Sequence, residues 1–79
     1  MDNYFYVVVK TTWQSGENTG YSAPVGVAMS KESANAFIMG WDDKIFVETE
    51  KEFNDGMISR FFKHQYDSME LDIQKVMAI

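Results

Sequence analysis

Apolar and β-branched side chains fill nearly every position of the segment from Tyr4 to Trp13. Such a run of aromatic and β-branched residues is typical of a β-strand. Odd-numbered positions such as Phe5 would share one face, and Tyr4, Tyr6 and Lys10 would share the other. Both faces are largely apolar, which predicts a strand covered on one side and partly covered on the other. The face with Tyr4, Tyr6 and Lys10 is a candidate surface for a homodimer or a partner.

A polar segment with two glycines, residues 14–20, interrupts this pattern and predicts a loop at the tip of a long hairpin. Val25, Val27 and Met29 then alternate with small residues, which indicates a second strand paired with the first. Pro24 fits the start of that strand, where its missing amide does least harm.

Helical spacing follows the second strand. Bulky residues recur at i, i+3, i+4 and i+7, namely Ala34, Phe37, Ile38 and Trp41. This spacing predicts an amphipathic helix from Lys31 to about Trp41. Ser30 suits its N-cap, and Glu32 lies where the positive end of the helix dipole favours an acid.

The second half of the chain indicates a further helix and a last strand. Residues 45–48 have strand composition but little length, and they form either a short edge strand or an extended linker. Residues 49–52 match the capping box, so we expect a helix over residues 50–64. One stripe of that helix would carry Phe53, Met57 and Phe61. Gly56 would weaken it by about 1 kcal/mol relative to alanine. Residues 69–79 alternate apolar and polar side chains and predict the final strand.

These elements predict an α+β fold with the order β-β-α-(β)-α-β. We expect a two-layer sandwich, in which a three- to four-stranded, mostly antiparallel sheet carries two helices on one face. The 79 residues form a single domain spanning residues 1–79, without a linker or an internal repeat.

Negative charge is concentrated in one short segment. The net charge is −5, and residues 42–55, with six acids and two lysines, carry four of these five charges. The six acids are Asp42, Asp43, Glu48, Glu50, Glu52 and Asp55. Glu70 and Asp72 would extend them across the open face of the last strand. Two interpretations stay open: a surface that docks on a basic site of another protein, or a solvated face whose acids favour a helix N-terminus.

The acidic balance excludes several classes of partner. A DNA or RNA reader needs cations that displace counterions from phosphates, so direct nucleic-acid binding is not expected. An anionic membrane surface is disfavoured for the same reason. No segment approaches the roughly 18 apolar residues of a membrane span. The chain has no cysteine, which fits a soluble protein of the reducing cytoplasm and removes thiolate zinc sites.

Catalytic chemistry has little support in the sequence. His64 is the only histidine, and its place near the end of the predicted helix suits a cation at the negative end of the dipole. The spacing of a calcium-binding EF-hand loop is absent. We therefore expect neither an enzyme nor a bound metal or cofactor.

Trp13 and Tyr21 flank the predicted loop over residues 14–20. Large aromatic side chains dominate binding hot spots, and they also dominate small cores, so both roles stay open. With the six acids, they complete the set of candidate partner-binding residues.

The candidate function is a small acidic inhibitor that docks on a basic surface of a larger protein, for which a nucleic-acid-binding protein would be a natural target. In size, charge and lack of catalytic groups, the chain resembles the small acidic inhibitors that phages and mobile elements make, such as anti-CRISPR or anti-restriction proteins. This resemblance implies binding without catalysis. The alternatives are a homo-oligomeric structural or regulatory domain and an antitoxin-like partner of a cognate toxin.

Overall fold

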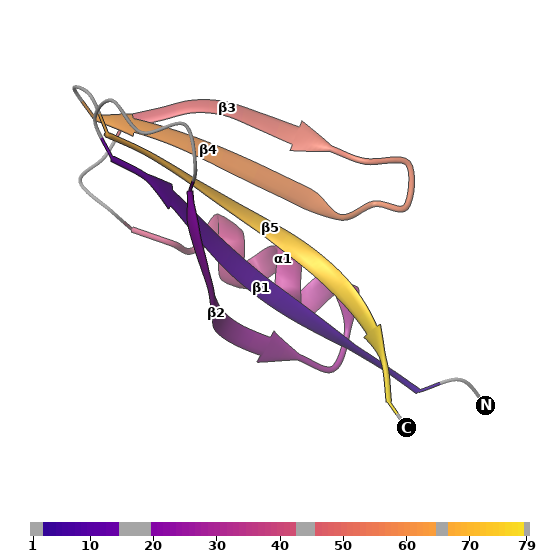
Figure 1. Cartoon of the computed structure of the whole chain (residues 1–79). Coiled ribbons are helices and arrows are strands. Elements are labelled where there is room, and N and C mark those ends of the chain that lie inside the picture. The colour runs from indigo at the N-terminus through magenta and orange to yellow at the C-terminus, as the bar shows by residue number, and fades with distance from the viewer. Residues whose placement is uncertain (1–2, 15–19, 43–45, 65–66, 79) are drawn as a thin grey trace.

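A computed structural model describes residues 3–14, 20–42, 46–64 and 67–78 of the chain. Its elements in chain order are β1 (Tyr4–Trp13), β2 (Tyr21–Ala28), α1 (Lys31–Met39), β3 (Phe46–Glu52), β4 (Ile58–His64) and β5 (Asp67–Met77). Across these residues the five strands form one sheet in the order β2-β1-β5-β4-β3, and all neighbouring strands are antiparallel (Figure 1).

The predicted first, second and last strands are confirmed. β1 pairs along its whole length with β5, from Tyr4 opposite Met77 to Trp13 opposite Ser68. β2 pairs with the other edge of β1 and begins earlier than expected. Pro24 lies inside β2, next to a register shift opposite β1, and bulges of this kind are where a sheet tolerates a residue without an amide.

The predicted first helix is also confirmed, at Lys31–Met39. The Ser30 hydroxyl oxygen accepts a hydrogen bond from the Ser33 amide at 3.1 Å and caps the first turn. Ala34 and Ile38 have no exposed surface. Phe37, one of the two aromatics of the stripe, lies over Gly26 of β2, where an added Cβ would come within 3.2 Å of its ring.

The core forms between α1 and one face of the sheet. Its buried members are Val8, Ala34, Ile38, Phe62, Met69 and Leu71. Because Val8 belongs to this core and Tyr6 packs against it, the even-numbered face of β1 is the covered one. The face of Tyr4, Tyr6 and Lys10 was predicted to be a surface for a second copy or a partner. This prediction is wrong at Tyr6, which packs against the core. Lys10 lies with its amine 5.8 Å from the ring centre of Trp41. The uncovered face carries Phe5 and the other odd-numbered residues of β1.

The predicted second helix is wrong, and with it the two-helix α+β sandwich. Residues 50–64 contain the end of β3, a turn and β4. Gly56 has a φ of 85° in that turn, and the Phe53 amide donates to the Met57 carbonyl at 2.8 Å. A spacing of four residues is a multiple of the strand period as well as one helical turn, so the stripe of Phe53 and Phe61 did not discriminate between the two. Over the residues that the structure describes, the fold is mostly β, with one short helix on one five-stranded sheet.

The outermost strand β3 extends the sheet beyond the helix. α1 packs against β1, β2, β4 and β5. All seven residues of β3 are exposed. β3 therefore takes its position from β4, its partner on the inner side, as Figure 1 shows.

Candidate functional site

Three glutamates and one aspartate lie along the outer side of the sheet and the turn that follows. Glu48, Glu50 and Glu52 belong to β3, and Asp55 lies in the turn between β3 and β4. All four are exposed. We name these four residues the acidic edge. Most of the local negative charge expected from the sequence is thus gathered on one exposed strand and its turn.

The other two acids of the charged segment are not part of this surface. Asp42 is exposed just after α1, and Asp43 lies outside the described residues. The sequence predicted Glu50 and Glu52 at the start of a helix, where they would interact favourably with the helix dipole. On a strand, Glu50 and Glu52 instead lie on the same face of the sheet, because alternate side chains point to the same side.

The register of β3 fixes which side each residue takes. Glu50 lies opposite Arg60 and Glu52 opposite Ile58, so both share the face that α1 covers further along the sheet. Thr49 and Lys51 share the uncovered face. Glu48 falls at a register shift, where the strand bulges.

Arg60 of β4 ties this edge to the helix. Its Nη1 donates to the carbonyl of Ile38 at 2.8 Å, and the carbonyls of Trp41 and Met39 lie 3.3 and 3.4 Å away. These oxygens end α1, whose last turn contains no basic residue of its own, so the guanidinium meets the negative end of the dipole. On its other side, Arg60 Nε lies 3.7 Å from the Glu50 carboxylate. Glu50 is thereby placed by a buried cation while half of its side chain stays exposed.

The polar flank of α1 holds the turn that follows β3. The Asn35 side chain donates to the Gly56 carbonyl at 2.9 Å and accepts from the Ile58 amide at 3.1 Å. The Lys31 amine donates to the Asp55 carbonyl at 2.8 Å. The Asp55 carboxylate accepts from the Met57 amide at 3.0 Å. Sequence reasoning missed both Asn35 and Lys31, and the Asn54-Asp55-Gly56 turn signal was the cue that could have revealed them.

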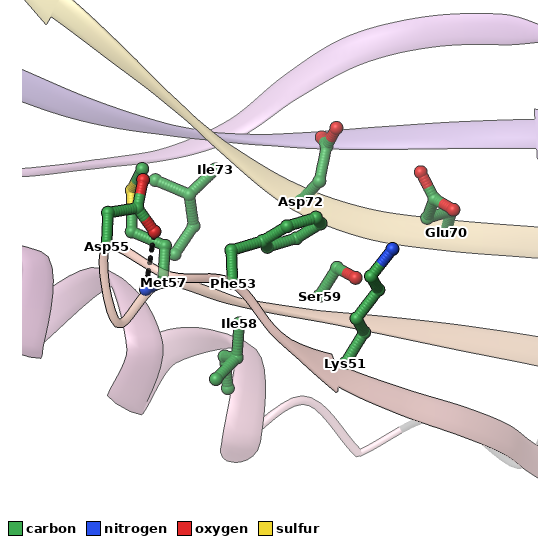
Figure 2. Close-up of a pocket in the computed structure, with 9 residues that line it drawn as sticks. All are labelled: Lys51, Phe53, Asp55, Met57, Ile58, Ser59, Glu70, Asp72 and Ile73. Carbon is green, nitrogen blue, oxygen red and sulfur yellow. Dashed lines mark hydrogen bonds between the residues drawn. The ribbon is translucent and has the colours of Figure 1, made fainter.

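A cavity of about 380 Å³ lies beside the acidic edge, and Lys51, Phe53, Ser59, Glu70 and Asp72 are among its lining residues (Figure 2). The Lys51 amine points toward Glu70 and lies 5.0 Å from the ring centre of Phe53. Glu70 and Asp72 lie on the uncovered face of β5, opposite Thr11 and Val9 of β1.

Both cavity carboxyls are partly buried, and burial is the main cause that raises the pKa of each. The negative charge of Asp72 raises the pKa of Glu70 further, while Lys51 lowers it in part. A hydrogen bond with its own backbone lowers the pKa of Asp72 in part. Among the described residues, no donor reaches Asp72 Oδ1. The charged forms of both carboxyls are therefore poorly solvated on this face.

The two candidate aromatics lie elsewhere. Trp13 is partly buried on the uncovered face, where its ring centre lies 6.4 Å from that of Phe61. Tyr21 is 65% exposed at the start of β2, the strand at the opposite edge from β3. The structure thus does not bring Trp13 and Tyr21 together with the acidic edge, and their part in binding stays a prediction.

The described part of the chain contains no cluster of three histidine, aspartate or glutamate side chains that could hold a metal ion. Within the same residues, no helix has the length and apolar character needed to cross a membrane. Comparison with protein-family models, curated proteins and solved structures gave no significant match for this chain, so its function must be inferred from its own surfaces.

Proposed function

We propose that this chain is a non-enzymatic binding protein whose acidic edge docks on a basic surface of a larger protein. The observation that carries the proposal is the line of exposed glutamates on the outermost strand. Of these glutamates, Glu50 is paired with the buried Arg60, and Asn35 and Lys31 fix the turn that follows the strand. A rigid surface loses little side-chain and loop entropy on binding, and its charge speeds encounter with a basic partner.

The partner that suits this surface is a protein that itself binds nucleic acid. Its lysines and arginines are placed to meet phosphate oxygens, and carboxylates can bind the same groups. Occupying them would inhibit the partner, as phage and mobile-element inhibitors of the anti-CRISPR or anti-restriction kind do. An antitoxin-like role would use the same surface. The lack of cysteine supports a cytoplasmic setting for this binding.

A pull-down with matched charge variants tests the proposal. The edge variant is Glu48→Lys with Glu52→Lys, and the control is Glu32→Lys with Asp42→Lys, which changes the net charge equally at exposed sites off the edge. Glu50 is left in place because of its ion pair with Arg60. We expect the wild-type chain and the control variant to retain a partner that the edge variant loses. Moderate salt should release this partner from the wild-type chain. A partner held equally by both variants would contradict docking through the acidic edge.

A second function, self-association, is favoured by the uncovered face of the sheet. Phe5, Val7 and Val9 line its β1 part, and Val76 and Val27 beside them are 43% and 67% exposed. No described element covers this face. Size-exclusion chromatography with light scattering gives the mass in solution. A dimer that Val9→Lys dissociates supports this function, whereas a monomer at high concentration counts against it.

A further inference from the structure

The two outer strands of the sheet differ in how open they are to a further strand. β2 contains Pro24, which has no amide to donate, and a register shift beside it. β3 bulges at Glu48 but then runs in regular register from Thr49 to Glu52 without a proline. The outer side of β3 has no neighbouring strand among the described residues. The backbone groups on that side are therefore available for pairing.

The charge of β3 discriminates between possible occupants. In a continuous sheet, opposed residues lie on the same face. If two copies paired antiparallel through β3, central registers would place Glu50 opposite Glu48, Glu50 or Glu52 of the second copy. Like charges directly opposite each other destabilise a strand pair, so the strand resists pairing with itself. A segment with lysine or arginine at these positions gains opposite-charge pairs instead.

The alternation along β3 defines the pattern that such a segment needs. Glu50 and Glu52 are two residues apart on one face, and Lys51 lies between them on the other. An added strand would therefore carry basic side chains at positions i and i+2, with a neutral or acidic residue between them. Glu50 would then lie between two cations, Arg60 on the inner side and the new one on the outer side.

We infer that the outer side of β3 binds an extended basic segment of the partner, which adds a strand to the sheet. This inference rests on the proposed docking through the acidic edge and specifies its form. Main-chain hydrogen bonds would supply the affinity, and the alternating charges would supply the specificity.

Synthetic peptides test strand addition on the whole chain. The probe is a short peptide in which lysine alternates with threonine, and its control is the same peptide N-methylated at alternate amides, which keeps the charge but removes main-chain donors. Binding is measured by titration with amide NMR spectra, followed by hydrogen exchange. We expect the probe to slow amide exchange within residues 49–52, and the methylated peptide to bind about tenfold more weakly.

Each other outcome overturns strand addition. Equal binding of both peptides would show that charge alone docks them, which leaves the proposed function standing. Protection of β2 or of the uncovered face in place of β3 would assign the segment to another surface. Failure of the probe to bind, while the pull-down shows a partner lost with the edge variant, would mean that the partner uses a folded basic surface.

Discussion

Replacing Arg60 with methionine tests how α1 is held to the sheet. Methionine has similar length and can keep the contact with Phe62, whose ring centre lies 4.7 Å from the guanidinium carbon. The change removes one donor to the Ile38 carbonyl, at 2.8 Å, and the two longer contacts at the end of the helix, while the Trp41 amide still donates to the Ile38 carbonyl. It also removes a buried positive charge, since Arg60 is only 9% exposed.

The expected loss follows from these contacts. A hydrogen bond from a charged donor is worth about 1.5–3 kcal/mol, and the long contacts add little. The half-exposed ion pair with Glu50 adds less than about 1 kcal/mol. The substitution also removes the cost of burying the charged guanidinium, and this offsets part of the lost stability. We expect a net loss of about 1–3 kcal/mol, against a total stability of about 4–12 kcal/mol for a chain of this length. The Tm should fall by about 5–20 °C.

Urea and thermal unfolding followed by circular dichroism measure this loss. Glu50→Gln is the matched control, because it breaks only the outer ion pair and should cost less than about 1 kcal/mol. If Arg60→Met were as stable as wild type, the cost of burying the charge would equal the gain from the carbonyls. A net stabilising role of Arg60 in holding α1 to the sheet would then be refuted.

Three further changes test the turn and the cavity. Gly56→Ala forces an alanine to φ of 85° and should lower the unfolding free energy by about 1 kcal/mol, as read by urea titration. Asn35→Ala breaks two hydrogen bonds to the turn and should cost about 1–3 kcal/mol, with faster hydrogen exchange at residues 53–58; unchanged exchange would contradict this anchor. Because burial raises the pKa of Glu70 and Asp72, the folded state holds their protons more tightly than the unfolded state. Their contribution to stability is therefore complete below about pH 4 and is lost as pH rises through the folded pKa. Asp72→Asn should flatten that decline in Tm between pH 4 and pH 7 and raise stability at pH 7 by less than about 1 kcal/mol, since solvent still screens the carboxylate.

The first half of the fold could be predicted from the sequence because local signals there agree with tertiary packing. Ser30 and the spacing of Ala34 and Ile38 define α1, and the β-branched run defines β1. The covered face of β1 could not be predicted, because Tyr6 and Val8 on one side and Val7 and Val9 on the other are all apolar. Only the position of α1 decides between them.

The hairpin of β3 and β4 was missed because two patterns overlap in it. Thr49 and Glu52 fit a helix cap, while Arg60 and Phe62 alternate with exposed or half-exposed neighbours as a strand does. The concentration of charge in residues 42–55 could be read from the sequence, and the role of the acidic edge in binding stays a prediction. Its anchors, Asn35 and Arg60, could not be found in that way, because each acts on backbone about 20 residues away in the sequence.

The pairing of β1 with β5 has a consequence for the order of folding. The two strands lie side by side in the middle of the sheet, and near the chain ends the Ala78 amide donates to the Asn3 carbonyl at 2.8 Å (Figure 1). During synthesis, β1 has no partner on this side until residues 67–77 have left the ribosome. Contacts between residues so distant in sequence form slowly. The hairpin of β3 and β4 should therefore form before β1 pairs with β5. Until then the side of β1 that pairs with β5 in the folded protein stays unpaired, and an unpaired strand of apolar residues favours aggregation.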